Sequence, residues 1–237
     1  MLKALYQHHL APEYALLYQD TVYQGLNEVS PVLCAIEPED ALWQLLVNEW
    51  PQQQAVVLLR STCDLSELQH HLARLISVEA AGSGRCDFRF YEPAIAEFLF
   101  PALTPAQFEQ MLGPVSAWVW PWALSGTLVE WHGITRAKAP VLMDRFILDG
   151  GAMQALARMT RHNQYNRLAK QLFTQGLLTG EPQQRVDQIA RRCEQLERQG
   201  VKQIKVLENH LVQQLQHEAH GDVSPALAKE SLPGVQP

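Results

Sequence analysis

The stretch AVVLLRSTCDLSELQHHLARLISVEAAGSGRCDFRFY, residues 55–91, decides the fold class. Its apolar start, Ala55–Leu59, is typical of a strand that is buried on both faces. A helix is expected next, because Asp64 is a candidate N-cap and leucines recur at helical spacing up to Ile76. The Gly-Ser-Gly turn at residues 82–84 then joins two short strand candidates into a hairpin. This succession of strand, helix and hairpin indicates a fold of the α/β (α+β) class.

The sequence on either side of this stretch alternates in the same way. Short apolar runs predict strands, and the segments between them show helical spacing and begin at prolines or N-cap residues. The further strands are expected at Tyr14–Tyr18, Pro31–Ile36, Val115–Trp120 and Thr127–Trp131, and the further helices before Pro51, after Pro93 and after Thr104. Strands that alternate with helices in this way predict an N-terminal mixed β-sheet with flanking helices.

The second half of the chain differs in both pattern and charge. Residues 1–135 carry 5 Lys and Arg against 15 Asp and Glu, whereas residues 136–237 carry 14 against 10. Helical spacing dominates the later part of the chain, where Gln and Arg are frequent. We therefore expect an α/β lobe over residues 1–135 and an all-helical lobe over residues 136–219. Residues 220–237 contain too few apolar side chains to pack and are predicted to form a disordered tail.

Composition and motifs argue against several classes of function. No apolar run is long enough to span a bilayer and no secretory signal is visible, so we expect a cytoplasmic protein without membrane contact. The four cysteines form no CxxC pair, which indicates reduced thiols, and the nine histidines do not gather with other ligands into a metal site. Phosphate-loop, nucleophile-elbow, dinucleotide-binding and zinc-protease motifs are missing, so we predict no catalytic residue and no cofactor.

The run CDFRFYEP, residues 86–93, carries the most informative local pattern. It lies in the second strand of the predicted hairpin, which places Phe88 and Phe90 on one face and Arg89 and Tyr91 on the other. An arginine flanked by aromatic residues on a half-buried strand needs an acceptor. We expect a structural ion pair, whose loss would leave a buried carboxylate unpaired at a cost of about 3–5 kcal/mol. The alternative is an arginine that binds a partner.

Three tryptophans, Trp118, Trp120 and Trp122, alternate along the sequence and would line one face of a strand. The simpler interpretation is that they form core beneath the helices. The alternative is an exposed aromatic platform for a protein partner, because Trp, Tyr and Arg dominate interface hot spots.

A basic surface is expected on the helix that begins near residue 151, and it includes Arg158 and Arg161. The simpler interpretation is a solvated helix face, and the alternative is a surface that receives an acidic protein segment. Nucleic acid is the weakest partner, because the acidic first half would repel a phosphate backbone.

The ordered series from Tyr14 to Trp122 resembles the DUF4123 family. The residues that carry the resemblance are YALLY, PVLCAIEP, AVVLLRS followed by LSELQHHLARLISV, then DFRFYEP and FEQMLGPVSAWVW. The family typically carries an RFYDP-like run, in which Glu92 takes the acidic position here. The later helical half resembles the variable C-terminal lobe of such proteins, without a match at the level of residues.

The resemblance implies a non-enzymatic, cytoplasmic adaptor of the bacterial type VI secretion system. Such a chaperone binds a toxic effector, often through the effector's N-terminal region, and promotes its loading onto the spike protein VgrG in a transient contact. The residues we expect to bind the partner are Arg89, Tyr91, Trp118, Trp120, Trp122, Arg158 and Arg161.

An enzyme is the alternative of a different class. On an α/β scaffold, Asp87, Arg89 and Glu92 would act around a small polar substrate. A deep pocket that joins these three side chains would favour the enzyme, whereas a long open groove with exposed tryptophans would favour the adaptor.

Overall fold

The computed structural model describes residues 2–8, 11–38, 41–53, 56–122, 129–136, 145–201 and 204–219. In these residues the chain has a mixed α/β fold with a helical C-terminal region, which confirms the predicted fold class. Contacts divide the chain into two units, Met1–Asn163 and Gln164–Pro237. The division falls inside α6 (Gly150–Thr174), and so lies beyond residue 135, where the change in charge and pattern suggested a boundary. The predicted tail lies outside the described residues.

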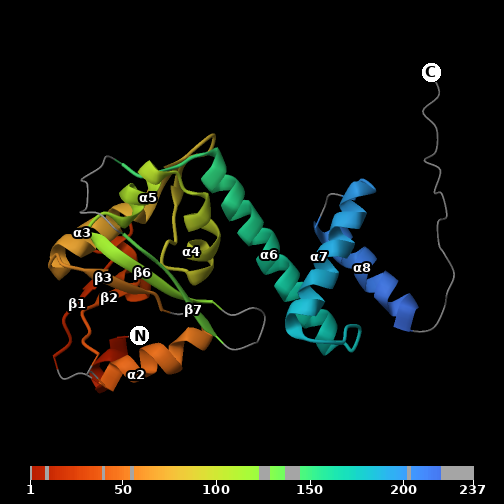
Figure 1. The fold of residues 1–237 in the computed structure, drawn as a ribbon, viewed down its shortest axis with the longest axis horizontal. Coiled ribbons are helices and arrows are strands. Elements are labelled where there is room, and N and C mark those ends of the chain that lie inside the picture. The colour runs from red at the N-terminus through yellow and green to blue at the C-terminus, as the bar shows by residue number, and fades with distance from the viewer. Residues whose placement is uncertain are drawn as a thin grey trace. The chain divides into compact units, whose positions relative to one another are not determined.

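The largest sheet of the first unit has β6 as its middle strand. β6 (Val115–Trp122) pairs antiparallel with β3 (Leu58–Ser61) on one edge and with β7 (Glu130–Thr135) on the other. Helices α4 and α5 lie on one side of this sheet and α2 on the other (Figure 1). β3 is only half-buried, with Arg60 exposed, so the expectation of a strand buried on both faces is wrong. An antiparallel strand at a sheet edge does not need the cover that a central parallel strand needs.

The remaining strands form two smaller sheets. β1 (Tyr14–Leu16) pairs antiparallel with β2 (Val32–Cys34). β4 (Ser77–Ala80) forms the predicted hairpin with β5 (Gly84–Asp87) and also pairs in parallel with β8 (Ile147–Leu148). The described strands are therefore divided among three sheets, of which only the one containing β4 has both parallel and antiparallel pairs.

Local capping explains where the helices of the first unit begin. The Asp64 carboxylate accepts a hydrogen bond from the Glu67 amide at 2.7 Å, and Thr104 forms a capping box with Gln107. Pro93 and Pro105 stand in the first turn of their helices, as predicted. The helices are α1 (Leu2–His8), α2 (Ala41–Asn48), α3 (Leu65–Leu75), α4 (Pro93–Leu99) and α5 (Pro105–Leu112), with 3₁₀ helices η1 (Gln24–Val29), η2 (Trp50–Gln53) and η3 (Phe100–Ala102).

The second unit, as far as it is described, is helical. It contains the later part of α6 together with α7 (Pro182–Arg198) and α8 (Ile204–Ala219). α7 ends at a turn in which Gly200 has a φ of +96°, and α8 follows as a separate helix. Apolar residues at helical spacing along α7 and α8 form the core of the unit, with Val186, Ile189, Cys193, Leu196, Leu207, Leu211 and Leu215 all buried.

The end of α5 packs tightly against α3. Gly113 has a φ of +53°, and a Cβ added there would overlap the His71 ring. The same ring contacts the Met111 carbonyl oxygen through Nε2 at 3.0 Å, and Arg136 donates to the Gly113 carbonyl at 2.7 Å. This junction therefore leaves no room for a side chain at Gly113.

We predict that Gly113→Ala strongly destabilises the first unit. The backbone conformation alone costs about 1–3 kcal/mol for a residue other than glycine, and the overlap with His71 adds about 1–3 kcal/mol. Gly82→Ala is the matched control, because Gly82 has a φ of +76° but open space around its Cβ position. Urea unfolding should show a clearly larger loss for Gly113→Ala, and equal losses would contradict the packing described.

His71 should also make stability depend on pH. Burial lowers the pKa of His71, and Arg74 and Arg136 lower it further, so the folded state resists protonation. As pH falls through the unfolded pKa of about 6.5, the unfolded state gains a proton that the folded state does not, and the free energy of unfolding falls. Between pH 7.5 and 5.5, wild-type stability should therefore fall more steeply than that of His71→Asn in denaturant titrations. Parallel slopes would contradict the prediction.

Candidate partner-binding surface

The segment that joins β1 to β2, residues 17–31, presents apolar side chains to solvent. Val22, Leu26 and Val29 are 76%, 54% and 71% exposed, and η1 contains no buried residue. Scattered apolar residues are normal on a protein surface, whereas three within eight residues mark a candidate contact region. Sequence reasoning missed this segment, although Val22, Leu26 and Val29 have the i, i+4, i+7 spacing of one helix face.

Hydrogen bonds at the base of the segment hold it to the body of the first unit. The Leu17 amide donates to the Pro31 carbonyl at 3.0 Å, and the Tyr18 amide donates to Ser30 Oγ at 3.0 Å. The buried Gln69 side chain on α3 donates to the carbonyl of Leu16, at the end of β1, and to that of Gln19, each at 3.4 Å. The exposed apolar residues therefore stand on an anchored loop, which is a common arrangement for binding residues.

Two tyrosines connect the segment to the end of β5 and to the loop that follows it. The Tyr23 hydroxyl donates to the Asp87 carboxylate, and this hydrogen bond raises the pKa of Tyr23. The hydroxyls of Tyr18 and Tyr91 lie 3.3 Å apart, and the contact raises the pKa of Tyr18 to about 12. Both tyrosines of the segment therefore stay protonated at neutral pH. Asp87 and Tyr91, two residues of the informative run, thus help to position the segment.

Arg89 does not form the buried ion pair that we expected. Its side chain is 65% exposed, and Nε lies 2.8 Å from Glu92 Oε1 on the surface. The reason is that β5 ends at Asp87 and the backbone turns, with the Glu92 amide donating to the Arg89 carbonyl at 2.9 Å. Phe88 and Phe90, which were predicted to share one face of a strand, are both buried, but they lie in a loop.

The three alternating tryptophans are core residues. Trp118, Trp120 and Trp122 lie on β6 and are 0%, 4% and 8% exposed. They face the helices that cover this side of the sheet, so the simpler interpretation is confirmed and the exposed platform is wrong. None of the three therefore forms an exposed aromatic platform, although Trp120 lines a cleft that is described below.

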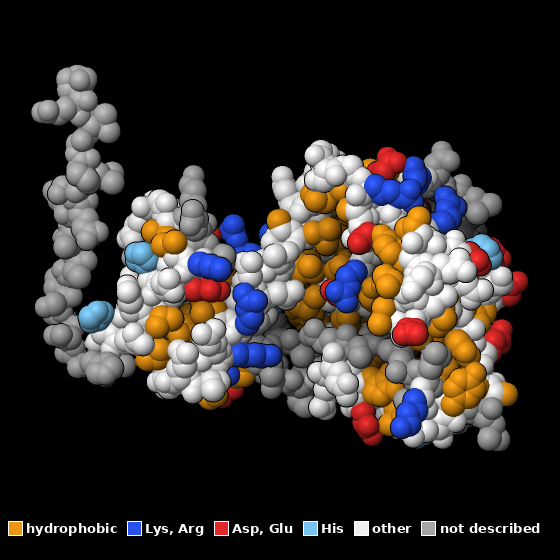
Figure 2. Space-filling view, turned by 180° about the vertical axis from the view of Figure 1, so that it is seen from behind, with side chains coloured by type: hydrophobic (Ala, Val, Ile, Leu, Met, Phe, Trp, Pro, Cys, Tyr) orange, Lys and Arg blue, Asp and Glu red, His pale blue; other side chains and the backbone are white. Residues whose placement is uncertain are grey.

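The two arginines of the predicted basic surface lie at exposed positions. Arg158 and Arg161 are both on α6, where a solvated helix face was expected. On the face of the molecule drawn in Figure 2, hydrophobic side chains form patches with charged side chains between them. The exposure of Arg158 and Arg161 leaves both of them as candidates for contact with a partner.

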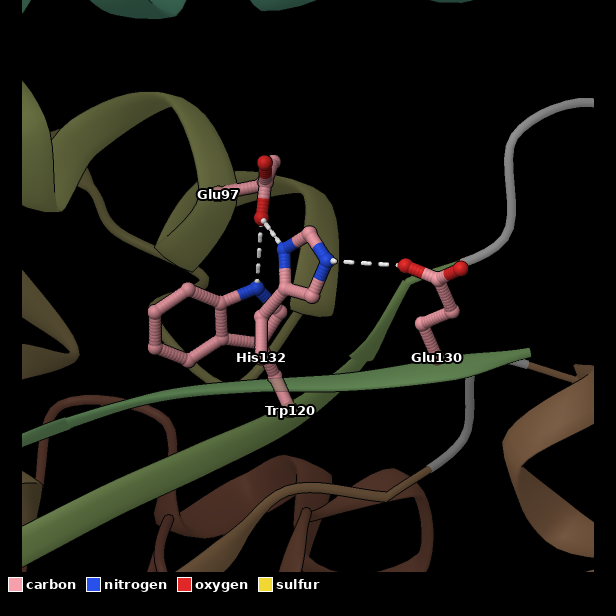
Figure 3. A network of polar contacts seen from close by, with 4 residues as sticks. All are labelled: Glu97, Trp120, Glu130 and His132. Atoms are coloured by element: carbon pink, nitrogen blue, oxygen red, sulfur yellow. Dashed lines mark hydrogen bonds and ion pairs between the residues drawn. The ribbon is translucent and has the colours of Figure 1, made fainter.

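A network of polar side chains joins α4 to the sheet (Figure 3). Trp120 Nε1 donates to Glu97 Oε2 at 2.9 Å, and His132 Nδ1 lies 2.8 Å from the same oxygen. Glu130 Oε2 lies 3.8 Å from the other ring nitrogen of His132. The network gives the buried indole N–H an acceptor, which a buried donor needs. The only signal in the sequence was Glu97 itself, a charged residue inside the apolar run PAIAEFLF.

A cleft of about 390 Å³ lies beside this network, between α4, η3 and the strands β6 and β7. Its lining residues are Glu97, Phe100, Pro101, Trp120, His132, Gly133 and Ile134. Asp87, Arg89 and Glu92, the residues of the enzyme hypothesis, are not among them. Asp87 is instead bonded to Tyr23, and Arg89 is paired with Glu92.

Residues 1–110 match the model of the family described as Domain of unknown function (DUF4123). The N-terminal part of the chain is therefore similar to DUF4123. The match confirms the family that the sequence suggested, and it includes the run around Arg89, α4 and most of α5. The tryptophan-bearing strand β6 lies beyond the matched residues. No curated protein and no solved structure gives a significant match to the chain.

Among the described residues, no three His, Cys, Asp or Glu side chains are grouped so that they could hold a metal ion. None of the helices in the described part of the chain combines the length and the apolar character needed to cross a membrane.

We predict that Arg89→Ala barely changes the stability of the first unit. An exposed ion pair at i, i+3 spacing contributes about 0–1 kcal/mol, far below the cost of breaking a buried pair. Thermal and urea unfolding of wild type and Arg89→Ala should therefore nearly coincide. Arg136→Ala is the contrasting variant, because the Arg136 side chain is 3% exposed and lies 3.0 Å from Glu109. A loss of several kcal/mol in Arg89→Ala would contradict the surface position of this pair.

Proposed function

We propose that the protein is a cytoplasmic adaptor that binds a type VI secretion effector and promotes its loading onto the VgrG spike. The proposal extends the resemblance to DUF4123 adaptors, and the family match supports its starting point. The effector's N-terminal region is the proposed ligand. The contact with VgrG is proposed to be transient, so that the effector can leave with the spike.

The observation that carries the proposal is the anchored apolar segment 17–31. A loop that exposes valine and leucine side chains while its base is fixed by hydrogen bonds loses little conformational entropy when it binds. Apolar side chains of a partner would bury Val22, Leu26 and Val29 and remove them from water. Arg89 and Tyr91 lie in the loop to which this segment is tied, so they are proposed to border the same interface.

The enzyme hypothesis remains an alternative to be tested by assay. Its three residues already contact other side chains of the chain, Asp87 with Tyr23 and Arg89 with Glu92. Purified protein can be screened with hydrolase and transferase substrates. Turnover that is lost in Asp87→Asn or Glu92→Gln would favour the enzyme over the adaptor.

The proposed function is tested with an effector that is encoded beside a VgrG gene in the same genome. Co-expression with the tagged effector should give a stable complex in size-exclusion chromatography with light scattering. Deletion of the adaptor gene should stop secretion of this effector while other effectors are still secreted. Secretion that continues unchanged, together with the absence of a complex, would contradict the adaptor function.

The location of the interface gives a sharper prediction. Leu26→Asp and Val29→Asp should each weaken effector binding by about thirtyfold or more, equal to about 2 kcal/mol, because a charge would enter an apolar contact. Stability should change by less than about 0.5 kcal/mol, since both side chains are exposed. Titration calorimetry measures the affinity and urea unfolding the stability.

Val206→Asp is the matched control, because Val206 is an exposed valine on α8 in the second unit. Its affinity for the effector should equal that of wild type. Equal losses of affinity for the effector in Val206→Asp and Val29→Asp would contradict the proposed interface. So would wild-type affinity in both Leu26→Asp and Val29→Asp.

A further inference from the structure

We propose that the cleft between α4 and β7 is a binding site for an arginine side chain on a basic segment of the protein partner. The inference rests on the proposed function, which it deepens by naming the chemistry of one part of the partner. It concerns a different place from segment 17–31, and it follows from the charge, the walls and the position of the cleft.

The cleft has a carboxylate in its wall. Glu97 comes from α4, its side chain is 25% exposed, and its Oε2 contacts both Trp120 Nε1 and His132 Nδ1. Figure 3 shows both contacts ending on one oxygen, with the second oxygen directed away from the two rings. Two N–H contacts to one oxygen fix the orientation of the carboxylate before any ligand arrives. A carboxylate held in this way is a ready acceptor for the N–H groups of a guanidinium.

The other walls of the cleft are apolar and suit the apolar stem of an arginine side chain. Phe100 and Trp120 stack with ring centroids 5.4 Å apart, and both line the cleft together with Pro101 and Ile134. A volume of about 390 Å³ is also within the range of sites that hold a small ligand or a single large side chain.

The surrounding charge favours a basic partner segment. Glu130 lies beside His132 and is 77% exposed, so a second carboxylate faces the solvent near the cleft. Over residues 1–135 the chain carries 5 Lys and Arg against 15 Asp and Glu. Such a surface attracts positively charged segments and repels acidic ones. An arginine in the cleft would neutralise the charge of Glu97. His132, which also contacts this carboxylate, carries a positive charge only when it is protonated.

The test is a titration of the ¹⁵N-labelled full chain with two probes, followed by NMR. The cationic probe is N-acetyl-arginine methylamide, and the neutral probe is N-acetyl-norleucine methylamide. We expect saturable shifts of the Trp120 indole N–H and of the Gly133 and Ile134 amides with the arginine probe only. Equal shifts with both probes, or arginine shifts elsewhere without any in the cleft, would overturn the proposal.

Charge removal gives the second arm of the test. Glu97→Gln should lower the affinity for the arginine probe by about tenfold or more, because a charge-assisted hydrogen bond is lost. Glu79→Gln is the control, since Glu79 is an exposed glutamate that pairs with Arg145 at 2.6 Å on another sheet, and its affinity should equal that of wild type. Retained affinity in Glu97→Gln would overturn the proposal. If Glu97→Gln does not fold, the comparison of the two probes on the wild-type chain still shows whether the cleft binds arginine.

The probe titration uses no effector, so it separates this inference from the proposed function. If the chain captures the effector but does not bind the arginine probe, the proposed arginine site is overturned and the proposed adaptor function is retained. If the chain binds the arginine probe through Glu97 but captures no effector, the proposed arginine site is supported and the proposed adaptor function is overturned.

Discussion

Trp118 is fully buried between Phe90 and Phe100, and much of the first unit is arranged around this contact. Its ring meets both phenylalanines edge-on, at centroid distances of 5.8 Å and 5.5 Å. Phe90 precedes α4 and Phe100 follows it, so a single aromatic cluster on β6 fixes both ends of that helix. The position of α4 in turn places Glu97 over Trp120 and leaves the cleft above β7. The proposed arginine site thus depends on a core contact that the partner never touches.

The same buried phenylalanines organise the surface. Phe88 and Phe90 point inward, and this leaves Asp87 and Tyr91 free to hold the tyrosines of segment 17–31. A core on one side of a loop and hydrogen bonds on the other give the segment a fixed base. The segment can therefore expose its apolar residues and still keep a defined position on the first unit. Binding through segment 17–31 therefore uses side chains that the core positions, rather than the tryptophans that form the core.

Local signals in the sequence predicted most helices and the β4–β5 hairpin, because caps and turns depend on a few neighbouring residues, as Asp64 and Thr104 show. The alternation of buried and exposed residues at 86–91 was also predicted correctly, yet the same alternation occurs in a loop, so it could not reveal that β5 ends early. The cleft could not be predicted, because Glu97 and His132 meet only through the register that pairs Trp120 with His132. Register is a property of the sheet, and short-range patterns in one sequence do not specify it.

Amide hydrogen exchange tests the central claim most directly, namely that β6 and its tryptophans are the structural centre of the first unit. Measured as a function of urea, the amides of β6 should exchange only through global unfolding of that unit, with the largest protection free energies in residues 1–163. The amides of Val22–Val29 should exchange much faster, because η1 contains no buried residue. Rapid exchange of Trp118 and Trp120 through local opening, while α3 and α5 stay protected, would contradict the account.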